Sequence, residues 1–221
     1  MARPDPARVA TARELRERLA VYLDELQRWN RRLNLTSVPG AALWAHHVDD
    51  SLALAELTGL SAGDRVIDIG SGAGVPGLVL AIAHPDAAVT LLEADTRKAG
   101  FLTHVAGKLA LTAVAVVDRR AEEAAHDSSL RECFGVAVSR AAAPAATLCE
   151  LALPFVRVGG CLYAQVGDAD LDVERCRAAA AVCGGGAPEA VRPGVLRVRK
   201  LTPTPSAYPR RAGVPSRRPL R

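Results

Sequence analysis

The N-terminal part of the chain carries apolar residues at helical spacing. Between about residues 6 and 32 they recur every three or four positions, which predicts an amphipathic helix. Asp5-Pro6 supplies a capping residue and a first-turn proline at its expected start. A second helical pattern covers residues 41–58 and ends at Gly59. These helices predict an N-terminal helical extension, residues 1–60, that packs on a core formed by residues 61–221.

From Arg65 onward, short apolar runs alternate with helical patterns. This alternation is typical of βαβ units and a parallel sheet. Strands are expected near residues 65–69, 88–92, 113–117, 134–139, 160–165, 191–199 and 213–217. The predicted fold class is therefore α/β, with a mostly parallel seven-stranded sheet.

The composition is that of an ordinary globular domain, with 221 residues of which 49% are apolar and 24% charged. No apolar run reaches membrane-spanning length, so no membrane partner is expected. The five cysteines contain no C-x-x-C pair, which argues against both a zinc site and a disulfide framework. Reduced cysteines and the lack of a secretory signal pattern predict a cytoplasmic protein.

The basic charge is concentrated at one end of the chain. Residues 191–221 hold nine arginines and lysines and no acidic residue, although the net charge of the whole chain is only +4. Such a segment is either a solvated tail or a surface that binds phosphate groups, and composition alone does not separate the two.

The stretch Val66–Gly77 joins a β-branched strand to a glycine-dense turn that opens a helix. Glycine permits a close backbone approach, and a helix N-terminus offers unpaired N–H groups, so an anionic or ribose-bearing ligand is expected here. Gly72–Gly77 fits the dinucleotide pattern G-x-G-x-x-G, but the turn already begins at Gly70, which disfavours a pyrophosphate site. With D-x-G-x-G-x-G over Asp68–Gly74, the stretch resembles motif I of the class I S-adenosylmethionine-dependent methyltransferases, which have a Rossmann-like fold.

Glu93 ends the next apolar run, about twenty residues after the glycine turn. A carboxylate in that place suits the two hydroxyls of a ribose, in S-adenosylmethionine and in NAD alike. The carboxyl ends of parallel strands meet at one edge of a sheet. Residues 68–74, Glu93, residues 118–122 and Ser139-Arg140 should therefore converge on a single crevice.

Seven stretches, taken together, resemble one family, the bacterial RsmG (GidB) methyltransferases, which modify N7 of a guanosine in 16S ribosomal RNA. The matching stretches are Trp29–Thr36 (W-N-x-x-L-N-L-T), His47–Leu52 (H-V-D-D-S-L), Asp68–Gly77, Arg97–Leu102, Arg120–Glu122, Ser139–Ala141 and Tyr208–Pro215 (Y-P-R-R-x-G-x-P). The resemblance covers about residues 25–219. It implies S-adenosylmethionine as the cofactor, no metal, and 16S ribosomal RNA or a small-subunit particle as partner, with no protein partner predicted.

The resemblance also implies roles for individual residues. Glu93 should hold the ribose, while the Ala121 backbone and the Glu122 carboxylate should meet the adenine. The cofactor-binding set it implies is Asp68, Gly70, Gly72, Gly74, Val75, Glu93, Ala121, Glu122 and Arg140. The substrate-binding set is Arg140, Tyr208, Arg210 and Arg211. Simpler roles remain open, a helix cap for Glu122 and a surface ion pair for Arg140.

Two features of the sequence fall outside these assigned roles. The family usually has Lys-Gly after the fifth strand, whereas this chain reads Gln165-Val166-Gly167, so a cation is missing from the rim of the crevice. His47 and Asp50 lie three residues apart on one helix face, and we interpret them as a structural hydrogen-bonded pair.

Methylation of guanine N7 needs no proton transfer, because N7 has an exposed lone pair and no proton. No catalytic acid or base is therefore predicted, and catalysis should depend on alignment and the exclusion of water. Two other functions remain open from the sequence. They are an NAD-dependent oxidoreductase of Rossmann type and a non-catalytic RNA-binding protein.

Overall fold

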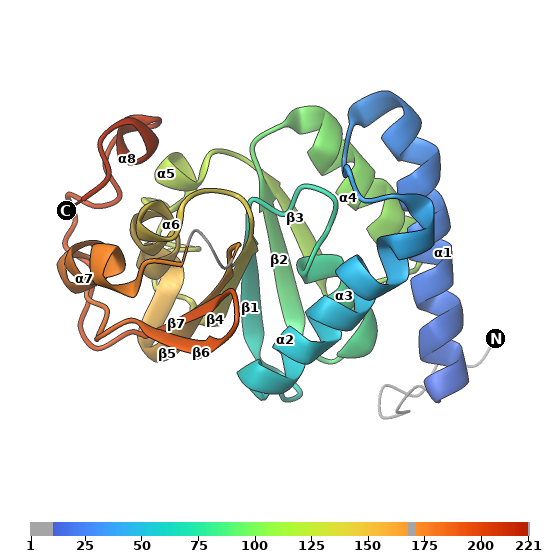
Figure 1. Ribbon diagram of the computed structural model, residues 1–221, viewed down its shortest axis with the longest axis horizontal. Helices are drawn as coiled ribbons and strands as arrows, with labels where there is room; N and C mark the ends of the chain where they lie inside the picture. Colours follow the sequence, from blue (N-terminus) through green and yellow to red (C-terminus); the bar gives the residue numbers. More distant parts are fainter. Residues whose placement is uncertain (1–10, 168–170, 221) are drawn as a thin grey trace.

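The computed structural model, which describes residues 11–167 and 171–220, has a seven-stranded sheet at its centre (Figure 1). The strand order is β3-β2-β1-β4-β5-β7-β6. The strands are β1 (Arg65–Ile69), β2 (Ala88–Glu93), β3 (Val114–Asp118), β4 (Phe134–Arg140), β5 (Val156–Gln165), β6 (Glu189–Arg192) and β7 (Val195–Arg199). β1 to β5 pair in parallel, and β7 runs antiparallel to both β5 and β6. The predicted mostly parallel seven-stranded sheet is confirmed.

Helices cover both faces of the sheet because alternate strand residues point to opposite sides. Val66 of β1 packs in one apolar cluster, whereas Ile67 and Ile69 pack in the other. The first cluster includes residues of α1 (Ala12–Leu33), α2 (Asp50–Thr58), α3 (Gly77–Ala83) and α4 (Thr96–Lys108). The second includes residues of α5 (Ala121–Ala124), α6 (Ala145–Ala152) and α7 (Val173–Val182). The short helix α8 (Val214–Arg217) packs on α6.

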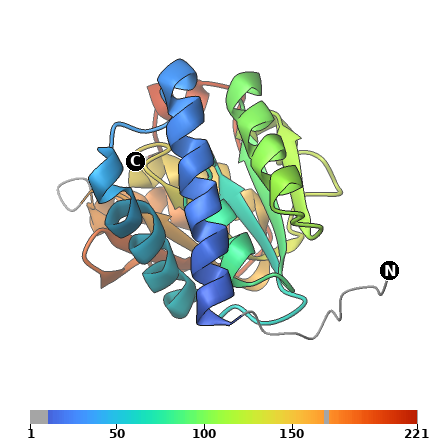
Figure 2. The ribbon, with the colours of Figure 1, turned by 90° about the vertical axis from the view of Figure 1, so that its right-hand side faces the viewer.

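α1 lies across the side of the molecule, where it packs on α3 and α4 (Figure 2). It starts later than the sequence predicted. Its N-cap is Thr11, whose side chain and Glu14 form a reciprocal capping box, and the predicted Asp5-Pro6 cap lies outside the described residues. The T-x-x-E signal was present in the sequence and was overlooked.

The second predicted helix is divided. A 3₁₀ turn (Gly40–Ala42) and a widened π-helical turn (Trp44–Asp49) precede α2. Such widened turns are rare and tend to occur at functional sites, because they rotate side chains away from the regular helical positions. No described helix is long and apolar enough to cross a membrane.

Two strand predictions were wrong. The single strand expected over 191–199 is a hairpin, since Pro193-Gly194 turns the chain between β6 and β7. The strand expected over 213–217 is the helix α8, which begins after Gly213 in the left-handed region (φ 76°) and has Pro215 in its first turn. The fifth strand also begins earlier than predicted, at Val156, and its register shifts between Phe134 and Val136 of β4.

Candidate functional site

A cavity of about 560 Å³ lies at the carboxyl edge of the sheet. Loops after four parallel strands form its walls, namely residues 69–73, 93–94, 119–122 and 140–143. Residues 35–38 and Ser216 of α8 complete it. The predicted crevice therefore exists. Of the predicted cofactor-binding residues, Gly70, Gly72, Val75, Glu93, Ala121, Glu122 and Arg140 line it, whereas Asp68 and Gly74 lie outside the lining.

The glycine turn leaves room beside its backbone. Gly70 and Gly72 have positive φ angles of 71° and 50°, which glycine adopts without steric cost. A Cβ on Gly70 would lie 2.6 Å from the Cβ of Ala142, so the β4 loop packs directly against the turn. A Cβ on Gly72 would meet no atom closer than the Gly70 carbonyl oxygen at 3.8 Å. Gly72 thus borders open space where a ligand can approach the chain.

Asp68 supports the turn from behind. Its side chain is completely buried, and Oδ2 accepts a hydrogen bond from the Gly77 N–H at 3.0 Å. Oδ1 has no hydrogen-bond partner among the described residues. Burial raises the pKa of Asp68 to about 7, although the bonds from Gly77 and Ser71 act in the opposite direction. Asp68 therefore fixes the start of α3 relative to β1.

Glu93 bridges the glycine turn and the loop after β2. Its Oε2 accepts the Gly72 N–H at 2.8 Å, and its Oε1 accepts the Asp95 N–H at 2.8 Å. The side chain lines the cavity and is nearly buried. A carboxylate has about four lone-pair positions, so these two bonds leave capacity for a ligand.

Arg140 is the last residue of β4 and faces the widened helical turn. It donates to the His46 carbonyl oxygen and, at 2.9 Å, to His47 Nδ1, and it lies 3.9 Å from Asp50 Oδ2. No hydrogen bond joins His47 to Asp50, so the predicted pair is wrong, because both side chains interact with Arg140 instead. Burial lowers the pKa values of His47 and Arg140.

The contact with Arg140 also determines which ring nitrogen of His47 carries the hydrogen. Because Nδ1 accepts from Arg140, Nε2 carries the hydrogen and donates it to Thr36 Oγ1 at 3.0 Å. Thr36 Oγ1 accepts a second bond, from the Val38 N–H at 3.1 Å. The Thr36 hydroxyl hydrogen is then free to donate to a ligand in the cavity that Thr36 lines.

Tyr22 connects α1 to the glycine turn. Its hydroxyl donates to the Ala73 carbonyl oxygen at 3.0 Å, and its ring is completely buried. Burial raises the pKa of Tyr22 well above its ordinary value. The sequence placed Tyr22 on the apolar face of a helix, and no local pattern indicated that its hydroxyl would reach a residue 51 positions away.

Ala121 and Glu122 stand where the chain after β3 enters α5. No described residue accepts a hydrogen bond from the Ala121 N–H, as expected for the first residue of a helix. Glu122 is buried, and its Oε1 accepts the Gly213 N–H at 2.8 Å. The Glu122 carboxylate therefore also holds the C-terminal segment beside the cavity.

The residues of the Y-P-R-R motif lie outside the cavity lining. Arg210 forms an ion pair with Glu150 of α6, through Nε to Oε1 at 2.8 Å and a terminal nitrogen to Oε2 at 2.6 Å. Glu150 is buried, with 1% of its side chain exposed, so Arg210 anchors the segment to the core. Arg211 is exposed and forms no ion pair with another described residue. Only Arg211 has the free charge that the sequence prediction assigned to both arginines.

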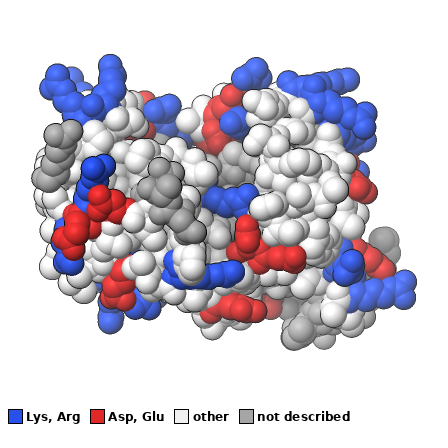
Figure 3. Space-filling view, in the orientation of Figure 1, with Lys and Arg blue, Asp and Glu red and all other residues white. Residues whose placement is uncertain are grey.

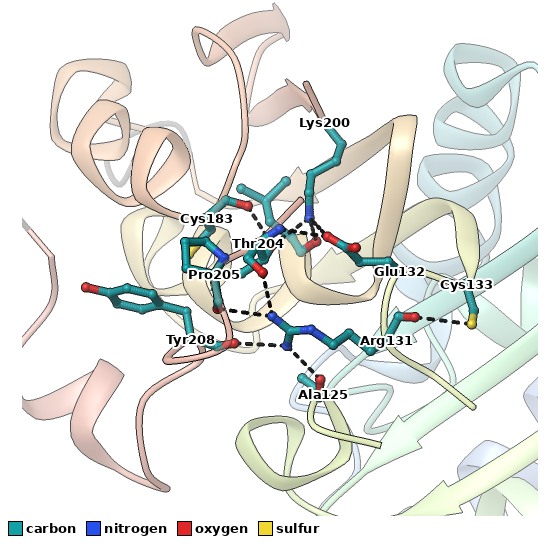
Figure 4. Close-up of polar contacts among 10 residues, drawn as sticks. Ala125, Arg131, Glu132, Cys133, Cys183, Lys200, Thr204, Pro205 and Tyr208 are labelled. Carbon is teal, nitrogen blue, oxygen red and sulfur yellow. Dashed lines mark hydrogen bonds and ion pairs between the residues drawn. The ribbon is translucent and has the colours of Figure 1, made fainter. Parts of the chain in front are cut away.

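A second anchor holds the chain before this motif (Figure 4). The guanidinium of Arg131 donates to the carbonyl oxygens of Ala125, Thr204, Pro205 and Tyr208. Nearby, the buried Lys200 ammonium donates to Thr204 Oγ1 at 2.6 Å and pairs with Glu132 at 3.1 Å. Figure 4 shows the Tyr208 ring turned away from this cluster. The backbone here is fixed, while the partly buried Tyr208 ring packs against the second apolar cluster.

The position that lacks the family's lysine lies against the widened turn. Gln165 Nε2 approaches the Asp50 carbonyl oxygen at 3.4 Å, and its buried Oε1 has no described partner. The five cysteines are free thiols. Among the described residues, no group of three His, Cys, Asp or Glu side chains could hold a metal ion.

Several cavity residues were missed by the sequence analysis. They are Leu35, Thr36, Ser37, Val38, Lys98 and Ser216. Thr36 was part of a recognised motif, W-N-x-x-L-N-L-T, and that membership was the available signal. The contribution of Ser216 depends on the fold of a segment that was predicted as a strand.

Comparisons with known proteins agree with this geometry. A family profile described as GidB, rRNA small subunit methyltransferase G, matches residues 15–199. The ribosomal RNA small subunit methyltransferase G of Roseiflexus castenholzii is 45% identical, over 96% of this chain and 97% of its own length. That of Chloroflexus aggregans is 44% identical, over 90% and 87%.

A solved structure from Methanococcus maripaludis, assigned to the S-adenosylmethionine-dependent methyltransferases, has the same fold. Its TM-score is 0.59 at 14% identity, over 90% of this chain and 98% of its own length. This likeness confirms the predicted fold class. The family match confirms the predicted cofactor, and the NAD-dependent oxidoreductase is set aside. The chain belongs to the rRNA small subunit methyltransferase G family of S-adenosylmethionine-dependent methyltransferases.

Proposed function

We propose that the protein transfers the methyl group of S-adenosylmethionine to N7 of a guanosine in 16S ribosomal RNA, either free or in a small-subunit particle. The observation that carries this proposal is the single cavity with two unlike sides. One side is the glycine turn with Glu93 and residues 119–122, and the other is residues 35–38 with Arg140. A cofactor on the first side would direct its methyl group toward a base on the second.

The cofactor side fits the molecule that it would hold. Gly72 borders open space, where the methionine portion can pass the backbone. Glu93 can accept bonds from both ribose hydroxyls with the lone pairs that Gly72 and Asp95 leave. The Ala121 N–H can donate to an adenine ring nitrogen. Glu122 accepts hydrogen bonds from Gly213 and Arg120 through Oε1, so its Oε2 can accept from the adenine amino group.

The substrate side offers hydrogen-bond donors. The Hoogsteen edge of guanine presents N7 and O6, which are both acceptors. The free Thr36 hydroxyl can donate to O6 and leave the N7 lone pair available for the methyl group. Arg140 and His47 would then act on the substrate indirectly, since they orient Thr36. The exposed Arg211 and the partly buried Tyr208 of the anchored segment would contact RNA beyond the cavity, while Arg210 would position that segment.

The chemistry makes modest demands on the protein. S-adenosylmethionine supplies an activated methyl group, and N7 attacks without losing a proton. The side chains therefore need to align the two reactants and exclude water. Asp68, an acid with a pKa of about 7, is buried behind the turn and bonded to Gly77, away from the cavity lining. Its position supports a structural role and not that of a base.

The test is methylation of 16S RNA in vitro. Purified protein, labelled S-adenosylmethionine and either free RNA or 30S particles from cells that lack the enzyme would be combined. Borohydride and aniline cleavage would then map 7-methylguanosine. We expect one modified guanosine, and reduced modification with Glu93→Ala at limiting S-adenosylmethionine. Methylation at another atom of the base would overturn the N7 assignment. RNA binding without any methyl transfer would instead favour the non-catalytic RNA-binding protein.

A further inference from the structure

Two further hollows lie beside the C-terminal end of α1. A hollow of about 220 Å³ adjoins the methyl-transfer cavity and shares Thr36 and Val38 with its lining. A third hollow, of about 520 Å³, shares Arg31 with the second. The α1 groove, as we name these two hollows, is lined by Gln27, Arg28, Trp29, Asn30, Arg31, Arg32, Leu33 and His104, together with residues 36–43 in part. The two hollows have Arg31 in common and lie between the methyl-transfer cavity and the C-terminal end of the helix.

The charge along this groove is positive and partly uncompensated. Arg31 and Arg32 are exposed, and neither forms an ion pair or hydrogen bond with another described side chain. By contrast, Arg28, His104 and Lys108 all surround the buried Glu25, which compensates them. Figure 3 shows Lys and Arg side chains gathered over this end of α1, at the upper right. The two unpaired guanidiniums of Arg31 and Arg32 therefore line the third hollow.

An aromatic ring lines the same hollow as these cations. The partly exposed indole of Trp29 lines the third hollow, and its ring centroid is 5.7 Å from that of Phe101 and 5.1 Å from that of His104. These contacts hold the indole in a fixed position. A fixed aromatic ring beside guanidiniums is the combination that binds single-stranded nucleic acid, through base stacking and phosphate contacts.

The groove is rigidly connected to the cavity. Asn30 binds the backbone of Thr36 in both directions, with its Nδ2 donating to the Thr36 oxygen at 2.8 Å and its Oδ1 accepting the Thr36 N–H at 2.9 Å. Thr36 in turn contacts His47. A chain bound along α1 would therefore lie at a set distance from the reacting base.

We propose that RNA flanking the methylated guanosine runs along the α1 groove, with phosphates at Arg31 and Arg32 and an unpaired base against Trp29. This inference rests on the proposed function for the nature of the strand. A simpler role for the two arginines is to offset the helix dipole at the end of α1, and that role makes no prediction for RNA. The two interpretations are therefore separable by experiment.

The test compares two double variants of the full chain. Arg31→Ala/Arg32→Ala removes the free cations of the groove. Arg157→Ala/Arg199→Ala is the matched control, since both of its arginines are exposed, lack described ion pairs and stand at the opposite edge of the sheet, beside the start of β5 and the end of β7. Fluorescence anisotropy would measure the affinity for a 16S RNA fragment across a salt titration, and calorimetry would measure S-adenosylmethionine affinity.

We expect the groove variant to lose roughly 1.4–1.8 units from the slope of log affinity against log salt, as two lost phosphate contacts predict. Its KM for RNA should rise, while kcat and cofactor affinity match those of the parent. The control should keep most of the parent slope. If the groove variant binds RNA like the parent at every salt concentration, the proposal is wrong. If both double variants lose slope equally, it is also wrong, because the effect is then one of net charge.

A second measurement addresses the aromatic contact. The chain has two tryptophans, so Trp44→Phe leaves Trp29 as the sole indole reporter. Saturating RNA should quench its emission, and unchanged emission would remove Trp29 from the interface. Both assays read binding without methylation. A parent that binds RNA through Arg31 and Arg32 but leaves N7 unmodified would contradict the proposed function and support the groove. If the parent methylates N7 but replacement of Arg31 and Arg32 does not change RNA affinity, the proposed function is supported and the groove proposal is contradicted.

Discussion

Replacing Arg210 with alanine should destabilise the fold, whereas replacing the adjacent Arg211 should not. Glu150 accepts three hydrogen bonds from Arg210, at 2.9 Å from the backbone N–H, 2.8 Å from Nε and 2.6 Å from a terminal nitrogen. A terminal nitrogen of Arg210 also donates to the Arg218 carbonyl oxygen at 2.8 Å. The alanine variant keeps only the backbone bond and leaves a carboxylate buried without a countercharge.

The size of this effect follows from the burial of the two partners. Breaking a buried ion pair by removing one side costs roughly 3–5 kcal/mol. The Arg210 side chain is 26% exposed, which places the cost near the lower limit, at about 3 kcal/mol. For a chain of this length, that loss lowers the melting temperature by roughly 6–12 °C. Arg211→Ala removes an exposed, unpaired side chain and should stay within about 0.5 kcal/mol of the parent.

Urea unfolding followed by far-ultraviolet circular dichroism would measure both variants. A double replacement, Glu150→Leu with Arg210→Met, should recover most of the loss, because an apolar pair of similar size needs no countercharge. RNA affinity, measured well below the melting temperature, should fall for Arg211→Ala with a slope change of about one unit. The reasoning is refuted if Arg210→Ala unfolds at the urea midpoint of the parent and loses RNA affinity instead.

Four further outcomes follow from the cavity and its supports. Gly72→Val should abolish S-adenosylmethionine binding in calorimetry with little loss of fold, since its side chain would enter the cavity from a backbone with φ 50°; unchanged affinity would contradict the position of the cofactor. Glu93→Ala should weaken cofactor binding by about 1–3 kcal/mol and leave RNA affinity alone, and a loss of RNA binding only would exclude the ribose role. Tyr22→Phe should lower the free energy of unfolding by about 1 kcal/mol through loss of the bond to Ala73, with weaker cofactor binding from a looser turn; equal cofactor affinity would show that the turn needs no support from α1. Because the pKa of Asp68 is raised to about 7, the folded state binds more protons than the unfolded state between about pH 4 and 7, so the contribution of this group to stability falls as pH rises through that range. Asp68→Asn should flatten this decline in urea titrations at pH 4.5 and 7.5, and a parallel decline in both proteins would assign it to other groups.

The central strands were predictable from local sequence. Each of β1 to β4 contains a short apolar run with two or three β-branched residues, and such runs form buried parallel strands with little dependence on distant context. The glycine turn and Glu93 were predictable for the same reason, since both follow directly from strand ends. The structure of the chain after β5 was less predictable. Pro193-Gly194 divides residues that look like one continuous strand, and Gly213 starts a helix where the apolar pattern suggested another strand.

The contacts that support the site were beyond the reach of local patterns. Tyr22 and Ala73, Arg140 and His47, and Glu122 and Gly213 are separated by 51, 93 and 91 residues. The motif around Arg210 was recognised, yet its role could not be assigned, because nothing beside it in the sequence indicates that Glu150 of α6 lies within reach. Local patterns therefore located the candidate ligand site but not the side chains that hold the walls of that site in place.

The walls of the cavity come from nearly the whole length of the chain, from Leu35 to Ser216. During synthesis on the ribosome, the glycine turn emerges long before the β4 loop that packs on it and the C-terminal segment that Glu122 holds. Sheets of parallel strands with such distant partners also fold slowly. The nascent chain should therefore be unable to retain S-adenosylmethionine until α8, which contributes Ser216 to the cavity, has left the exit tunnel.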